Sequence, residues 1–311
     1  MNPTLSPSRF LPDPSRQLRR LVGLLAGLLL AASLVRADLQ RPRPEPANPV
    51  LPSIFLIGDS TMRNGVGDGA GGQWGWGEPV ADFFDTTKVN VVNRAVGGVS
   101  SRTYITAGYW EKDVALLKKG DIAIIQFGHN DPGAINDSLR ARASLKGNGD
   151  DFQEIDNLVT KQHEVVHSYG WYLRKFVEDA QAKGATAIIC SPIPRMGWVN
   201  GQVPRNSIYN GWAADAAKQK GVGFIDVNEI SCRRIEQGGR AKALSCFPPK
   251  EPVHTNSVGA NLNAESVIAG SKLLPKNPLA PFFNDKGNAI PAIDLSKPAV
   301  PGPDSPVHTD Q

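Results

Sequence analysis

The sequence predicts a three-layer α/β/α domain, with a five-stranded parallel sheet enclosed by helices. Five short apolar runs rich in β-branched residues are almost unbroken in hydrophobicity, as strands buried on both faces are. Amphipathic stretches with helical spacing lie between them, and this alternation is typical of a parallel sheet covered on both faces. Ligands of such sheets bind beyond the carboxyl ends of the strands.

Each element is expected where the pattern of apolar residues changes. The strands are expected at residues 54–57, 89–92, 121–127, 185–190 and 222–227. The helices are expected at residues 77–85, 109–120, 168–184, 207–221 and 257–274. Gly184 and Gly221 stop two of these helices, and Ser257 is placed to cap the last.

Composition and the chain ends bound the domain. Of 311 residues, 41% are hydrophobic and 21% are charged, and the net charge is +4. So small a net charge argues against a dedicated nucleic-acid binder.

Arginines precede the uncharged run 21–35, which predicts a signal peptide over residues 1–37 and a secreted or periplasmic protein. The alternative is an uncleaved membrane anchor. A Pro-rich linker is expected at 38–51, the folded domain at 52–276 and a Pro-rich flexible tail at 277–311, whose segment 278–283 could pack back on the domain.

The three cysteines allow one disulfide in an exported protein. Cys232 and Cys246 flank a polar stretch and are the expected pair. Cys190 stands in an apolar run and is expected to be a buried thiol. No Cys-x-x-Cys spacing indicates a metal or redox site.

Polar residues with catalytic chemistry follow the predicted strands. Gly58-Asp59-Ser60-Thr61 follows the first, and Glu251 and His254 lie beyond the fifth. A serine hydroxyl is a weak nucleophile that needs a base. His254 is the candidate base, and Glu251, three residues earlier, is the candidate carboxylate that orients the imidazole and stabilises its charge. Asp59 and Thr61 are alternatively caps of a following helix.

Attack on an ester creates an oxyanion, which needs fixed hydrogen-bond donors. Three are candidates: the Ser60 N–H at an expected helix start, the Gly98 N–H and the Asn130 side-chain amide. Gly97-Gly98 is alternatively only a tight turn.

The order "GDST", "GG", "GHND" and acid-x-x-His resembles the SGNH (GDSL-type) hydrolases, whose four signature residues would be Ser60, Gly98, Asn130 and His254. The longer blocks "WGEPVADFF" and "NRAVGGVSSRTY" are similar to rhamnogalacturonan acetylesterases, over residues 52–274. One departure is Glu251, where that family usually has Asp. Another is Val253, where it often has His.

The resemblance implies flavodoxin-like strand order and a serine esterase that removes acetyl groups from a plant cell-wall polysaccharide, such as rhamnogalacturonan or another pectin. It implies an acetylated polysaccharide or oligosaccharide as partner, no metal or organic cofactor, and no nucleic acid. We further expect a monomer, with no membrane association once the signal peptide is cleaved.

Three other residues are candidates for substrate binding, each with an ordinary structural alternative. His129 either lines the site or supports its loop. Arg195 either faces an acidic sugar or is one of several solvated charges, and Trp198 either stacks on a sugar ring or fills a gap in the core. Asp131 is expected to be either a turn residue or a brace for the loop.

Two other functions remain open. Residues 163–167, "HEVVH", fit the His-Glu-x-x-His pattern of zinc peptidases. That pattern requires a helix, and the helix here is expected to begin only near Ser168. The second alternative is a carbohydrate-binding protein that keeps the fold without catalysis.

Overall fold

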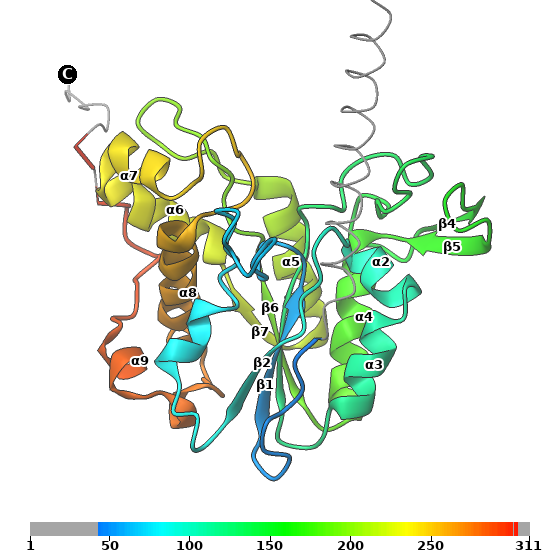
Figure 1. Cartoon of the computed structure of the whole chain (residues 1–311), viewed down its shortest axis with the longest axis horizontal. Coiled ribbons are helices and arrows are strands. Elements are labelled where there is room, and N and C mark those ends of the chain that lie inside the picture. The colour runs from blue at the N-terminus through cyan, green and yellow to red at the C-terminus, as the bar shows by residue number, and fades with distance from the viewer. Residues whose placement is uncertain (1–42, 301, 304–311) are drawn as a thin grey trace, which may run out of the picture. The chain divides into compact units, whose positions relative to one another are not determined.

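The computed structural model describes residues 43–300, 302 and 303, so the predicted signal peptide lies outside the described residues. Its centre is a five-stranded parallel sheet in the order β2-β1-β3-β6-β7 (Figure 1). The strands are β1 (Ser53–Gly58), β2 (Asn90–Asn93), β3 (Ile122–Gln126), β6 (Thr186–Cys190) and β7 (Gly223–Ile225). The predicted fold class and strand order are confirmed.

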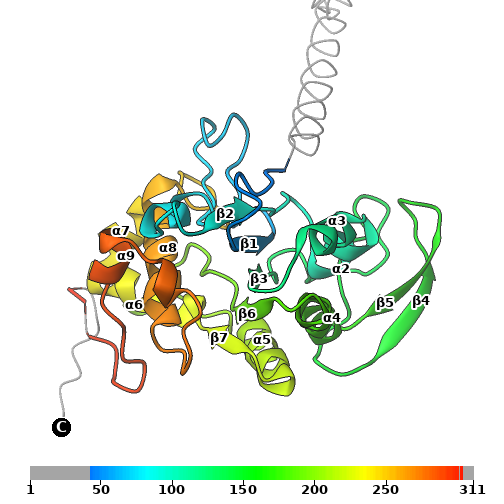
Figure 2. The ribbon, with the colours of Figure 1, turned by 90° about the horizontal axis from the view of Figure 1, so that it is seen from below.

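Helices cover both faces of the sheet, as Figure 2 shows. One side carries α2 (Ser101–Thr106), α3 (Tyr109–Leu116), α4 (Tyr169–Ala182) and α5 (Ser207–Lys220). The other carries α6 (Val227–Gln237), α8 (Ser257–Ser271) and the 3₁₀ helix η1 (Pro79–Phe83). Because side chains alternate across a strand, Phe55 and Ile57 of β1 pack toward the first layer, and Ile54 and Leu56 pack toward the second.

Several elements differ from the prediction. The helix expected at residues 77–85 is only the short η1, because Pro79 opens it and the chain becomes extended at Phe84. The stretch after β7, where the sequence predicts no helix before residue 257, contains α6 and α7 (Gly239–Ser245). The polar stretch before α4 contains β4 (Phe152–Asp156) and β5 (His163–His167), an antiparallel hairpin that extends from the domain in Figure 1.

Parts of the predicted linker and tail are built into the domain. Arg43 donates hydrogen bonds to Asp113 Oδ2 (2.9 Å) and the Tyr104 hydroxyl (3.0 Å), so this part of the expected linker is anchored. The expected flexible tail contains η2 (Ala280–Phe282) and α9 (Asp285–Ala289). Leu279 and Phe283 are buried in the core, as the alternative for segment 278–283 foresaw, so the described part of this segment is not a free tail.

The three cysteines are buried free thiols. The expected Cys232–Cys246 disulfide is therefore not formed, although both residues belong to one apolar cluster with Ile235 and Phe247. Within the described part of the chain, no helix is long and apolar enough to cross a bilayer.

Candidate active site

Ser60 stands on a tight turn directly after β1. A Cβ atom at Gly58 would lie 2.1 Å from Met62 Sδ and 2.7 Å from the Gln126 carbonyl oxygen, so only glycine lets the chain fold back here. The Met62 N–H donates to the Asp59 carbonyl (3.1 Å), and Asp59 Oδ1 accepts from the Thr61 N–H and hydroxyl (both 2.8 Å). The expected helix start at Ser60 is wrong, because Asp59 closes a side-chain turn that no helix follows.

A buried hydrogen-bond chain fixes this turn to the sheet. The Trp76 indole N–H donates to Gln126 Oε1 (2.8 Å), and Gln126 Nε2 donates to the Thr61 hydroxyl (2.7 Å). All three side chains are buried, where paired polar groups restrain geometry strongly. Thr61 thereby holds its neighbour Ser60 at the carboxyl edge of β1.

His254 meets Ser60 across the chain. The atoms Nε2 of His254 and Oγ of Ser60 lie 2.8 Å apart, although 194 residues separate them in sequence. The turn that carries His254 is held by two neighbours. The Trp74 N–H donates to the Thr255 carbonyl (2.7 Å), and the Met196 N–H donates to the Pro252 carbonyl (2.8 Å).

Glu251 lies on the far side of the imidazole. Its Oε2 is 3.3 Å from His254 Nδ1, within ion-pair distance. Among the described residues, Nδ1 has no hydrogen-bond partner, so the contact with Glu251 is an ion-pair approach. Glu251 Oε1 accepts the Val253 N–H (2.9 Å) and the His254 N–H (3.2 Å). Partial burial alone would raise the pKa of Glu251, but these hydrogen bonds and the nearby His254 outweigh it and lower the pKa, keeping the carboxylate ionised.

The three expected oxyanion donors lie on loops that leave neighbouring strands. The Val96 N–H donates to the Gly58 carbonyl (3.0 Å), so the Gly97-Gly98 turn begins beside the end of β1. Gly98 has φ +79°, a conformation that favours glycine. Asn130 Nδ2 donates one hydrogen bond, to the Val99 carbonyl (2.8 Å), which leaves its second N–H available. Among the described residues, neither the Ser60 N–H nor the Gly98 N–H donates a hydrogen bond.

The candidate substrate residues have different surroundings. His129 is buried, and neither ring nitrogen has a hydrogen-bond partner among the described residues. Burial, only partly opposed by the charge of Asp59, lowers the pKa of His129 to about 4, so the ring is neutral. Arg195 is exposed and donates to the His129 carbonyl (3.2 Å), and Trp198 packs half-buried against the cluster that contains Cys232. Asp131 braces the loop, as expected, by accepting from the Ser101 N–H (3.2 Å).

The "HEVVH" segment does not have zinc-peptidase geometry. It forms β5, where His163 and His167 are about 13 Å apart at the usual rise of a strand, rather than one turn apart on a helix. Glu164 binds the buried Arg102 through two 2.6 Å hydrogen bonds and so has a structural role. In the described part of the chain, no three His, Cys, Asp or Glu side chains form a group that could hold a metal ion.

Comparison with known proteins fits this arrangement. The model of the GDSL-like Lipase/Acylhydrolase family matches residues 56–262. The chain belongs to this family. It is a carboxylic ester hydrolase with the SGNH fold.

Two relatives of this acylhydrolase are named as a rhamnogalacturonan acetylesterase or a probable one. This chain is 30% identical to a rhamnogalacturonan acetylesterase of Emericella nidulans, over 70% of this chain and 83% of the relative. It is 28% identical, over 71% of its length and 93% of the relative's, to the probable rhamnogalacturonan acetylesterase YesY of Bacillus subtilis. Among solved structures, YxiM of Bacillus subtilis matches with TM-score 0.58 and 22% identity over 71% of this chain. The match spans 56% of that protein's chain.

One residue of this acylhydrolase was not predicted from its sequence. Gln73 Nε2 donates a 2.9 Å hydrogen bond to Glu251 Oε2, the oxygen nearest His254. Gln73 lies in a glycine-rich loop, where the Gly65 N–H donates to its carbonyl (2.9 Å). The only sequence signal is an amide residue within "GGQWGWG", which has no fixed relation to a site until the loop is folded.

Proposed function

We propose that this chain is a secreted or periplasmic acetylesterase that removes acetyl groups from a plant cell-wall polysaccharide, with rhamnogalacturonan or a related pectin as substrate. The observation that carries the proposal is the 2.8 Å approach of His254 Nε2 to Ser60 Oγ. This is the spacing at which an imidazole can remove a hydroxyl proton. The relatives named rhamnogalacturonan acetylesterases support the acetyl group and the pectin substrate.

The first half of the reaction forms an acetyl-enzyme. His254 Nε2 takes the proton of the Ser60 hydroxyl as Oγ bonds to the acetyl carbonyl carbon. The carbonyl electron pair moves to oxygen, and the N–H groups of Ser60 and Gly98 with the Asn130 amide stabilise that oxyanion. As the tetrahedral intermediate collapses, the bond to the sugar oxygen breaks, and His254 gives its proton to that oxygen.

The second half releases acetate. Water gives a proton to His254 and attacks the acetyl carbon, and the oxyanion forms again in the same place. Collapse breaks the bond to Ser60 Oγ, which recovers its proton from His254, and acetic acid leaves and ionises to acetate in solution. Glu251 stays ionised in both halves and stabilises each imidazolium from 3.3 Å. These steps are complete with side chains and water alone.

The test is acetate release from acetylated rhamnogalacturonan, acetylated xylan and p-nitrophenyl acetate. Wild-type protein is expected to release acetate from all three at measurable rates and to have the highest kcat/KM on rhamnogalacturonan. Ser60→Ala is expected to lose activity on each substrate while keeping the wild-type melting temperature. Preference for xylan would overturn the pectin assignment, and activity in Ser60→Ala would overturn the proposed nucleophile.

The carbohydrate-binding alternative gives a different result in the same assay. A binding protein without catalysis would leave p-nitrophenyl acetate intact and still retain the polysaccharide. Turnover that a metal chelator does not change would also separate the esterase from a zinc peptidase.

A further inference from the structure

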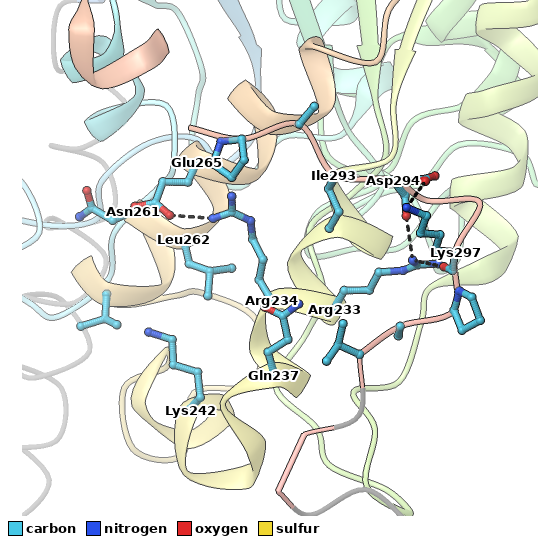
Figure 3. Close-up of a pocket in the computed structure, with 16 residues that line it drawn as sticks. Arg233, Arg234, Gln237, Lys242, Asn261, Leu262, Glu265, Ile293, Asp294 and Lys297 are labelled. Carbon is cyan, nitrogen blue, oxygen red and sulfur yellow. Dashed lines mark hydrogen bonds and ion pairs between the residues drawn. The ribbon is translucent and has the colours of Figure 1, made fainter. Parts of the chain in front are cut away.

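A pocket whose lining does not include Ser60 or His254 lies between α6, α7, α8 and the C-terminal segment 291–300 (Figure 3). Its volume is about 810 Å³, within the range of ligand-binding sites. Arg233 fastens segment 291–300 to α6 by donating to the Lys297 carbonyl (2.7 Å) and the Leu295 carbonyl (3.2 Å). One wall of the pocket is therefore a strap of chain held in place by hydrogen bonds.

The pocket carries an excess of positive charge. Four cationic side chains line it, against two carboxylates. Arg234 pairs with Glu265 (2.7 Å), and Lys297 pairs with Asp294 (3.4 Å). Arg233 pairs with Glu229, which lies outside the lining. Lys242 is half-buried, and its ammonium group has no ion-pair or hydrogen-bond partner among the described residues.

The remaining lining suits a sugar. Leu262, Ile293 and Pro291 offer apolar surface for the C–H face of a ring. Asn261 donates through Nδ2 to the Ser257 carbonyl (2.8 Å), which leaves its Oδ1 as an acceptor for a hydroxyl. Gln237 is an exposed lining residue, and Figure 3 shows Lys242 on the same side of the pocket as Leu262 and Asn261.

The pocket is also close enough to the candidate active site to share one polymer with it. Val258 lines the pocket and follows His254 by four residues. Four residues span at most about 14 Å. A polysaccharide of a few units is therefore long enough to reach from His254 to the pocket wall at Val258.

We infer that this pocket is a remote binding site for a uronate-bearing segment of the polysaccharide, with the Lys242 ammonium pairing to a uronate carboxylate. The inference rests on the proposed function for the identity of the polymer. It adds a site that selects acidic polysaccharides over neutral ones, at a distance from the ester that is cleaved.

The direct test measures binding of trigalacturonate, which carries no acetyl group, by isothermal titration calorimetry at low ionic strength. Wild-type protein should bind it, and Lys242→Glu should weaken binding at least about tenfold, the scale of a lost charge-assisted hydrogen bond. The matched control is Lys112→Glu, the same charge change at an exposed residue of α3 in the opposite layer. Absence of binding to wild type, or equal weakening by both variants, would overturn the inference. So would equal binding of neutral trigalactose.

A kinetic readout separates this inference from the proposed function. Lys242→Glu should raise KM on acetylated rhamnogalacturonan and leave turnover of p-nitrophenyl acetate unchanged, which also shows that the variant is folded. If wild-type protein releases acetate from pectin and Lys242→Glu has the same KM, the pocket inference fails and the function stands. If no acetate is released but trigalacturonate binding depends on Lys242, the function fails and the pocket inference stands.

Discussion

Gln73 Nε2 donates a 2.9 Å hydrogen bond to Oε2 of Glu251, a residue 178 positions later in the chain. The same oxygen is 3.3 Å from His254 Nδ1. A glutamate has one more rotatable bond than an aspartate, so its carboxylate needs additional restraint to orient an imidazole. Gln73 supplies that restraint from one side, and the Val253 and His254 N–H groups supply it from the other.

Replacing Gln73 should therefore slow catalysis without unfolding the protein. We expect Gln73→Ala to lower kcat about tenfold, since one hydrogen bond to a charged group is lost. KM for p-nitrophenyl acetate should change little, because Gln73 acts through Glu251. Gln153→Ala, at an exposed amide of β4, is the matched control and should be neutral. A kcat unchanged in Gln73→Ala would show that Glu251 needs no such support.

Asn130 should contribute to catalysis by stabilising the oxyanion. We expect Asn130→Ala to lower kcat by about 10²–10³, the usual scale for one oxyanion donor. Its other N–H holds the Val99 carbonyl, so the melting temperature of the variant must be measured in parallel. A loss of activity that is no greater than the loss expected from unfolding would remove Asn130 from the oxyanion site.

His129 should make the fold sensitive to acid. Its pKa is lowered to about 4 from an ordinary value of 6.5, so between these values the unfolded chain binds a proton that the folded protein does not. With respect to His129, the free energy of unfolding should therefore be at its maximum above about pH 6.5. It should fall by about 3 kcal/mol as the pH approaches 4. His129→Leu removes this loss, and its imidazole makes no hydrogen bond to a described residue that the variant would forfeit.

Urea unfolding of both proteins at pH 7 and pH 4.5 measures this difference. Burial, opposed by hydrogen bonds from Ser101, raises the pKa of Asp131 to about 6, so this group acts in the opposite direction and favours the fold as pH falls. Asp131 is present in both proteins, and only the difference between them reports on His129. An equal loss of stability in wild type and His129→Leu would contradict the account.

The parts of the fold that the sequence predicts are those with local signals. Strands such as Ile122–Gln126 are apolar up to their last residue, because the sheet buries them on both faces. The sequence alone predicts that Ser60 and His254 act together. The carboxyl ends of parallel strands share one edge of the sheet, and a serine nucleophile needs a base such as histidine. The turn at Ser60 resembles a helix start in sequence, because Asp and Thr occur both at helix caps and in side-chain turns.

The parts that could not be predicted depend on distant contacts. Strand β4 has four exposed residues in five, so it lacks the apolar pattern of a core strand and forms by pairing with β5. The Glu164–Arg102 pair joins residues 62 positions apart. It gives "HEVVH" a structural role that the His-Glu-x-x-His motif does not predict. Gln73 reaches Glu251 only after its loop is held, with the neighbouring Trp74 N–H bonded to the Thr255 carbonyl.

The most direct test of the account is covalent labelling with diisopropyl fluorophosphate, followed by mass spectrometry of the digested protein. The fluorophosphate phosphorus accepts a bond from an activated serine oxygen and fluoride leaves, so the adduct marks the nucleophile. We expect one adduct, on the peptide that contains Ser60, formed in step with loss of esterase activity and much more slowly in His254→Ala. Full inactivation with the adduct on another residue, or with Ser60 unlabelled, would contradict the proposal that Ser60 and His254 act together.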